Sequence, residues 1–311
     1  MTPYLNRFYC FLTGALIVFY GVMVNTCYAQ ELEPRRWNHV PKNTNFLGVG
    51  YGYTKADIFV DPVLSIEDAE LDLSTFVTKY IRTFELFGKT ARVDLISIFQ
   101  DAQWQGLLDG APRTVKRSGF ADPAVRFSIN LLGAPPLQGK DYAAYRRATE
   151  RETIAGAGLA VHLPLGEYFD DKLLNLGGNR FIFRPELGVV HDWGNWSVEL
   201  TGSVWLYTDN DDFFGGRRRE QDPLYTLQTQ LVYNFARGLW IAAGTGYGIG
   251  AESKIDDVRK DDESENIVWA LSFGFPIVKR LAGKIGYIGS ETLESTGADT
   301  NAISLGFVVS W

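Results

Sequence analysis

The chain has 311 residues, of which 46% are hydrophobic, 14% aromatic and 22% charged, and its formal net charge is −7. This apolar and aromatic content excludes an intrinsically disordered chain. The acidic balance and the absence of a basic stripe argue against nucleic acid as a partner.

The first 29 residues have the layout of a secretory signal peptide. A single charge at Arg7 precedes an apolar run over 8–24, and small residues surround the end at Ala29, where we expect cleavage. An uncleaved membrane anchor is the alternative, because this run approaches the length that spans a bilayer. Both cysteines, Cys10 and Cys27, lie in this stretch. The exported chain therefore has no cysteine, which excludes disulfide scaffolds and thiolate metal sites.

After Ala29, short segments alternate between apolar and polar residues, and this period of two is typical of β-strands. No stretch reaches the roughly 18 apolar residues that a membrane-spanning helix needs. We expect a periplasmic N-terminal segment over 30–43 and a single β-barrel over 44–311. Its twelve strands are predicted near 44–54, 72–84, 90–104, 120–131, 153–164, 180–191, 196–207, 224–235, 239–250, 266–276, 281–289 and 301–311.

The connections between these strands favour a transmembrane barrel over a soluble β-sandwich, which would show the same alternation. Tight turns are expected after the second, sixth, eighth and tenth strands, and long polar loops at the other end. An even number of antiparallel strands with short periplasmic turns and long extracellular loops is the layout of outer-membrane barrels. The join over 132–152 is an exception, and part of it is expected to form a small periplasmic helix.

Outward-facing aromatic residues sort into two groups. Near the periplasmic rim we expect Trp196, Tyr233, Phe235, Phe275 and Trp311, and near the opposite rim Tyr51, Tyr53, Tyr247, Trp269 and Tyr287. Two such girdles are typical of membrane barrels. The last strand ends with Phe307, Val309 and Trp311 on one face, which matches a signal for the outer-membrane assembly machinery. Pro185 lies inside a predicted strand and suggests a bulge.

A long central stretch resembles a known family. The matching pieces are KLLNLGGNRFIFRPELG over 172–188, WLYTDNDDF over 205–213, QDPLY over 221–225 and GLW over 238–240, with GFADPAVRFSINLLGAPPL over 119–137. They resemble the family named for the phenol meta-degradation pathway, whose members are outer-membrane barrel transporters. The resemblance implies passage of small, including aromatic, compounds, and it makes the bulge at Pro185 a built-in feature.

Strand parity places a mixed set of polar side chains inside the barrel. They are Arg92, Asp94, Arg126, His162, Arg184, Glu186, Glu199, Trp205, Tyr207, Gln228, Gln230 and Lys284. These groups either line a narrow pore or form a paired ladder that plugs it, because buried charges must pair or meet water. Trp205 and Tyr207 would stack against an aromatic solute or pack against an inward-folded loop. A run of glycines over 244–250 would widen the lumen on one wall.

No catalytic or metal site is expected. His39, His162 and His191 have no metal-ligand spacing, and no serine pairs with a histidine on the lipid-facing wall. We therefore expect no cofactor and no enzyme activity. Acidic loop clusters near 209–212 and 256–263 lack the spacing of a calcium loop, and three loop arginines near 217–219 would meet lipopolysaccharide phosphates or simply solvent.

The sequence thus predicts a channel of the outer membrane that passes a small hydrophobic or aromatic solute. Its expected partners are outer-membrane lipid, lipopolysaccharide, the assembly machinery and the solute itself. A plugged barrel with a structural or surface-binding role is the alternative. A barrel hydrolase that depends on His162 is a third reading.

Overall fold

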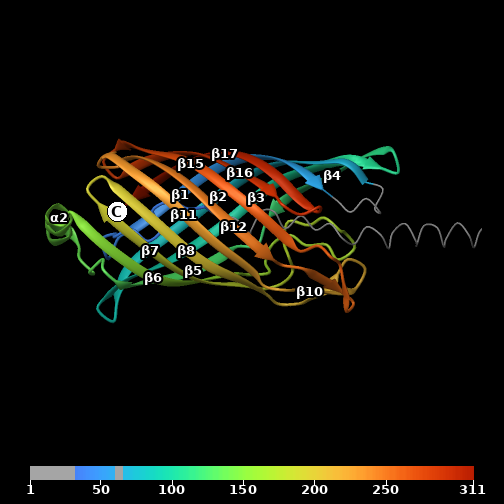
Figure 1. Cartoon of the computed structure of the whole chain (residues 1–311), viewed down its shortest axis with the longest axis horizontal. Helices are drawn as coiled ribbons and strands as arrows, with labels where there is room; N and C mark the ends of the chain where they lie inside the picture. Colours follow the sequence, from blue (N-terminus) through green and yellow to red (C-terminus); the bar gives the residue numbers. More distant parts are fainter. Residues whose placement is uncertain (1–31, 60–65) are drawn as a thin grey trace, which may run out of the picture.

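The chain folds into one elongated barrel, shown by a computed structural model that describes residues 32–59 and 66–311. The leader and its cleavage after Ala29 lie outside the described residues. Figure 1 shows long tilted strands, with helix α2 at one end and the extended hairpin of β3 and β4 at the other. The C-terminus lies at the α2 end. No helix in the described part of the chain is long and apolar enough to cross a membrane.

Twelve antiparallel strands close the barrel, as the sequence predicts. The sheet closes through β1 against β17 and through β2 against β3, while β4 and β5 together form one strand along β3. The barrel strands are β1 (Asn45–Phe59), β2 (Ile66–Leu86), β3 (Lys89–Leu108), β4 (Ala111–Phe120), β5 (Ala124–Leu132), β6 (Arg151–His162), β7 (Ile182–Trp193), β8 (Trp196–Tyr207), β11 (Leu224–Ala236), β12 (Leu239–Gly250), β15 (Ser264–Val278), β16 (Leu281–Thr292) and β17 (Gly297–Ser310).

The connections differ at the two ends. At the α2 end, two-residue turns join β2 to β3 and β7 to β8, with Gly88 and Gly194 at positive φ, where a side chain would be strained. The join over 132–152 contains the expected helix, α2 (Gly139–Ala148). At the other end, the loops carry a small sheet of β9 (Asn210–Phe213), β10 (Arg217–Gln221), β13 (Ser253–Ile255) and β14 (Val258–Arg259).

Two local predictions need correction. The residues 105–119 were expected to form a loop, but β3 and β4 pair throughout this region and turn only at Asp109 and Gly110. Pro185 makes no bulge, because the register of β7 against β8 is the same before and after it. The missing proline N–H only interrupts the pairing with β8, while Pro185 stays opposite Leu159 of β6.

The outer surface is apolar, as a lipid-facing wall requires. Along β17, alternate residues Ile303, Leu305, Phe307 and Val309 are all exposed. Members of the predicted aromatic girdles, such as Trp196, Tyr53 and Tyr247, are exposed on this surface. Trp196 and Tyr233 contact each other near the α2 end, with ring centroids 4.7 Å apart. At the other rim, tyrosine hydroxyls turn to polar partners, as Tyr247 does to Glu265 at 2.6 Å.

Two equally exposed leucines test where lipid meets this wall. Leu271 lies halfway along β15 and Leu293 lies in the β16–β17 loop, and each is 54% exposed. We expect Leu271→Arg to lower the free energy of unfolding from lipid vesicles by about 2–4 kcal/mol, because the guanidinium would enter hydrocarbon. Leu293→Arg is the control and should cost less than about 1 kcal/mol. Equal losses in urea titrations would contradict a hydrocarbon belt at Leu271.

Candidate functional site

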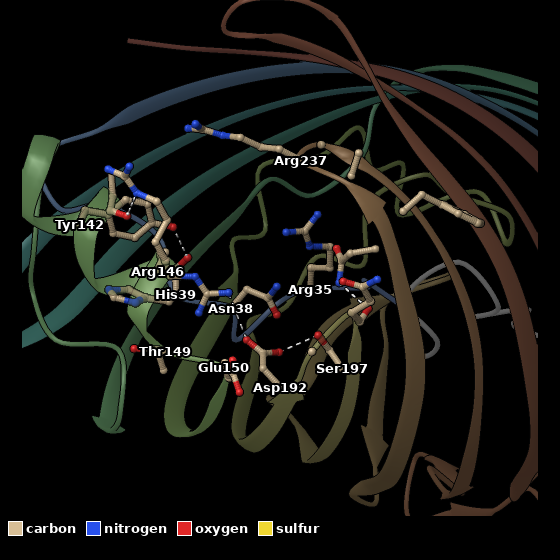
Figure 2. Close-up of a pocket in the computed structure, with 18 residues that line it drawn as sticks. Arg35, Asn38, His39, Tyr142, Arg146, Thr149, Glu150, Asp192, Ser197 and Arg237 are labelled. Carbon is tan, nitrogen blue, oxygen red and sulfur yellow. Dashed lines mark hydrogen bonds and ion pairs between the residues drawn. The ribbon is translucent and has the colours of Figure 1, made fainter.

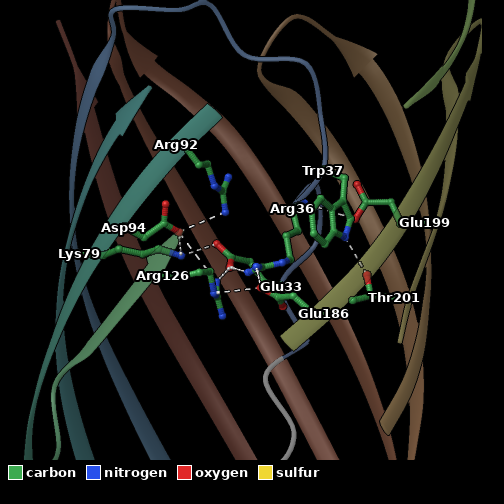
Figure 3. Close-up of polar contacts among 10 residues, drawn as sticks. All are labelled: Glu33, Arg36, Trp37, Lys79, Arg92, Asp94, Arg126, Glu186, Glu199 and Thr201. Atoms are coloured by element: carbon green, nitrogen blue, oxygen red, sulfur yellow. Dashed lines mark hydrogen bonds and ion pairs between the residues drawn. The ribbon is translucent and has the colours of Figure 1, made fainter. Parts of the chain in front are cut away.

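Residues 32–40 lie inside the barrel and form what we call the N-terminal plug (Figure 3). The segment was expected on the periplasmic side of the membrane. Instead its side chains, among them Leu32, Arg36, Trp37 and His39, are buried against the inner faces of the strands. Leu32 packs with Val268 and Ala270 of β15. The plug therefore narrows the lumen that the strands enclose.

An ion network ties the plug to the wall. Glu33 of the plug contacts Lys79 of β2 at 2.7 Å, Arg126 of β5 at 3.1 Å and its own neighbour Arg36 at 3.6 Å. Arg36 in turn donates a short hydrogen bond to Glu186 of β7. Glu33 and Arg36 thus bridge two parts of the wall, as Figure 3 shows.

The wall contributes the rest of the network. Asp94 of β3 is fully buried and lies 3.1 Å from Arg92, 3.5 Å from Lys79 and 3.8 Å from Arg126. The network joins three carboxylates to four cations. The carboxylates are Glu33, Asp94 and Glu186, and the cations are Arg36, Lys79, Arg92 and Arg126. Removing one member of such a buried group costs about 3–5 kcal/mol, because its partners remain buried without compensation. The ion pairs therefore fix the plug in one position.

Trp37 anchors the plug in a seat made by two glycines. A Cβ at Gly156 of β6 would lie 2.5 Å from the Trp37 ring, and one at Gly188 of β7 would overlap the indole. The indole nitrogen donates to the Thr201 hydroxyl of β8 at 2.9 Å. Only strands without side chains at these two points leave room for this ring.

At its periplasmic end the plug rests on α2. The His39 ring nitrogen lies 2.8 Å from the carbonyl oxygen of Pro135, and Tyr142 donates to the His39 carbonyl at 2.9 Å. Arg146 of α2 pairs with Glu152 of β6 at 2.9 Å. Burial lowers the pKa of His39, so the ring stays neutral near pH 7.

Beside this contact opens a cavity of about 750 Å³ (Figure 2). It lies between α2, the plug and the turns after β7 and β11. Arginines dominate its lining, with Arg35, Arg146, Arg147 and Arg237 against the acidic Glu150 and Asp192. The Arg35 guanidinium lies 5.6 Å from the centre of the Trp240 ring. A solute leaving the lumen on this side would meet a polar vestibule.

At the extracellular end, the loop over 163–181 folds inward. Asp122, in the short break between β4 and β5, accepts hydrogen bonds from the backbone of Gly166 and Gly178, each at 2.8 Å. Leu176 packs against buried apolar residues of β1, β2, β3 and β17. Leu173 packs with Phe213 and Ile255 of the small sheet. This loop and the small sheet together form what we call the extracellular cap.

The structure places the twelve sequence-predicted lumen residues on the inner face of the wall, in three places. Arg92, Asp94, Arg126, Glu186 and Glu199 surround the plug, with Glu199 accepting from the Arg36 backbone at 3.3 Å. His162, Arg184, Trp205 and Tyr207 lie beneath the cap. Gln228 and Gln230 lie on β11 opposite Thr201 and Glu199 of β8, next to the plug, and Lys284 lies on β16.

The glycine track of β12 does not leave open space. A Cβ at Gly244 would lie 3.0 Å from Gln230, and one at Gly246 would lie 2.9 Å from Val268 and 3.2 Å from Gln228. Neighbouring side chains fold over these glycines. The expected widening on this wall is therefore taken up by Gln228, Gln230 and Val268.

Sequence reasoning missed the plug residues Glu33, Arg36 and Trp37, and also Lys79. For Lys79 a signal existed, because strand parity places it on the inner face of β2 with the other lumen charges. For the plug, the run LEPRRW over 32–37 was readable as charged and aromatic, but it has no strand period. Only contacts with distant strands reveal its position.

The histidines form no metal site within the described ranges, where no three His, Cys, Asp or Glu side chains gather. His191 lies on the outer wall with Nδ1 2.8 Å from the Thr153 hydroxyl, a contact that sequence reasoning missed. No carboxylate of a described residue forms an ion pair with His191. His162 lies beneath the cap with its ring centroid 5.6 Å from that of Trp205.

Filling the glycine seat should release the plug. We expect Gly188→Ala to expel Trp37, because the new methyl would occupy the position of the indole. A cysteine introduced at Asn38 would then react with a maleimide at least about tenfold faster than in the parent barrel. Gly248→Ala is the matched control, since a Cβ there meets neighbours at an ordinary 3.5 Å. Equal labelling rates in both variants would contradict the seat.

Comparison with solved structures shows a similar fold in two proteins. The COG4313 outer membrane channel from Pseudomonas putida F1 is 21% identical, with a TM-score of 0.72, over 90% of this chain and 100% of that one. The transport unit of the autotransporter AIDA-I from Escherichia coli is 9% identical, with a TM-score of 0.53, over 97% of each chain. No curated protein matches this sequence.

A family match covers most of the barrel, over residues 60–287. This range spans β2 to β16 and includes all the wall residues that hold the plug. It also confirms the resemblance seen in the sequence over 119–250. The chain is an outer-membrane β-barrel that belongs to the family described as "Putative MetA-pathway of phenol degradation".

Proposed function

We propose that this protein is a channel for small hydrophobic or aromatic solutes and has no enzyme activity. The description of the family, which concerns phenol degradation, supports an aromatic solute. The observation that carries the proposal is a lumen lined by charges and filled by a segment of the chain itself, rather than by strand side chains alone. A barrel with a purely structural role would not need an N-terminal plug that can be displaced.

The plug is suited to displacement because side-chain contacts hold it. Its ties are the ion pairs of Glu33 and Arg36 and the indole hydrogen bond of Trp37. Buried ion pairs repay their desolvation only partly, so water that enters the lumen competes with them. A shift of residues 32–40 toward the periplasmic vestibule would open a path along Arg126 and Glu186.

Several features of the outer surface support the remaining partners that we propose. The exposed Phe307, Val309 and Trp311 suit recognition by the assembly machinery, and the exposed loop Arg218 suits lipopolysaccharide phosphate. Lipid contacts the apolar wall. We also propose that export removes the leader after Ala29.

Weakening the plug should raise conductance in planar bilayers. We expect the double variant Glu33→Ala and Trp37→Ala to increase single-channel conductance about two- to tenfold, because both its ionic tie and its anchor are lost. The control is Lys284→Ala, which removes an inward charge that forms no ion pair among the described residues.

The same recordings separate the channel from the second candidate, a plugged barrel with a structural role. The apolar contacts of Leu173 and Leu176 hold the extracellular cap over the lumen, and this favours that candidate. If the double variant and the parent both remain closed, and neither takes up phenol or toluene in liposome-swelling assays, the channel proposal is wrong.

A further inference from the structure

We propose that Arg180 and Arg219, two buried arginines of the extracellular cap, bind the carboxylate of a small organic anion. The proposal deepens the channel function, because it names the class of solute that the extracellular half of the lumen would recognise. Arg180 lies at the end of the cap loop, two residues before β7, and Arg219 lies in β10 of the small sheet. Each side chain belongs to a residue that is only 4% exposed.

Neither guanidinium has a carboxylate partner among the described residues. Arg180 lies over the Tyr207 ring at 4.5 Å and donates to the Gln221 amide oxygen. Arg219 lies 5.6 Å from the centre of the Phe213 ring. Aromatic faces and an amide offset only part of the cost of burying a full positive charge.

The nearest acidic groups already have other partners. Asp122 is held by two backbone N–H groups, Asp209 pairs with the exposed Arg218, and Asp262 accepts from the backbone and hydroxyl of Ser253 at 2.7 and 2.5 Å. They act on the two arginines only over a distance. Burial and the proximity of Arg219 lower the pKa of Arg180 to about 9. Burial is the larger cause, and repulsion between two cations without a shared anion adds to it.

Arg180 and Arg219 meet at Gln221, because Arg180 donates to the Gln221 amide oxygen and Gln221 lies two residues after Arg219 in β10. Nη1 of Arg180, Nε of Arg219 and Nε1 of Trp205 are buried and have no hydrogen-bond partner in the described part of the chain. The Tyr207 ring lies against Arg180, with its centre 4.5 Å from the guanidinium carbon. Such a set offers hydrogen-bond donors and positive charge, and the acceptor that Arg180 uses, the Gln221 amide oxygen, is neutral. Its complement is an oxyanion.

The contrast with the plug network supports this reading. Around Glu33 and Asp94 every arginine has a carboxylate within 4 Å, so that region needs no ligand. At Arg180 and Arg219 the described residues supply none. A planar carboxylate matches the fork of a guanidinium, and the Trp205, Tyr207 and Phe213 side chains provide an apolar border for an organic body.

Calorimetry on the refolded full barrel in detergent tests the site with sodium benzoate as the probe. We expect saturable binding in the parent protein and a loss of about tenfold or more in affinity in Arg180→Gln with Arg219→Gln. Arg218→Gln is the matched control in the same strand, because Arg218 is exposed and already paired with Asp209. It should bind benzoate as the parent does.

Thermal unfolding shows whether the variants are folded. The double variant should unfold at the same or a higher temperature than the parent without benzoate, since two uncompensated buried charges are removed. Benzoate should raise the unfolding temperature of the parent only. If the double variant is instead destabilised, the single variant Arg180→Lys, which keeps the charge but loses the fork, should still bind benzoate more weakly than the parent.

Three results would overturn the proposal. They are no saturable benzoate binding in the parent, equal binding in the double variant, or tighter binding of inorganic phosphate than of benzoate. Uptake of the neutral analogue benzyl alcohol into liposomes separates a failure of the carboxylate site from a failure of the channel function. Benzyl alcohol uptake without benzoate binding would refute only the carboxylate site, whereas benzoate binding without uptake of either compound would refute only the channel.

Discussion

The rest of the structure depends on the requirement that every backbone N–H and C=O in a bilayer finds a partner within the protein. Closure of β1 on β17 meets this requirement, with Asn45 and Trp311 exchanging hydrogen bonds at 2.9 and 3.1 Å at the seam. Once the sheet is closed, alternate side chains must point into a narrow interior. The wall therefore sends Asp94, Arg126 and Glu186 into a space with little water, where each charge needs a partner.

The plug supplies some of the partners that these buried charges need. Asp94 and Arg126 are directly opposite each other on β3 and β5, yet their ion pair is long at 3.8 Å. Glu33 reaches Arg126 at 3.1 Å and Lys79 at 2.7 Å, so the plug completes a network that the strands leave open. Its seat is equally specific, because the Trp37 indole occupies space that only glycine leaves free. Charge and shape thus select the same position for residues 32–40.

The two ends of the lumen differ in how their charges are balanced. Around the plug, cations and carboxylates lie within 4 Å of one another, and the interior is close to neutral. Within the cap, Arg180 and Arg219 contact aromatic rings and an amide, and no described carboxylate pairs with them. Arginines also dominate the periplasmic vestibule. A solute that crosses the barrel would therefore pass from one positive region to another through a region of paired charge.

The sequence by itself determined the strands, their number and the direction of their side chains. One face of each strand meets lipid and the other faces the lumen, so every strand must alternate with a period of two. The length of β3 and β4 was underestimated from the sequence. Their pairing continues beyond the lipid belt over 105–119, where no apolar alternation indicates a strand. The plug and the cap were decided only by tertiary structure. Glu33 and Leu176 have no local pattern that indicates their position. Their partners, such as Arg126 for Glu33 and Ala298 for Leu176, lie about a hundred residues away and come within reach only when the barrel closes.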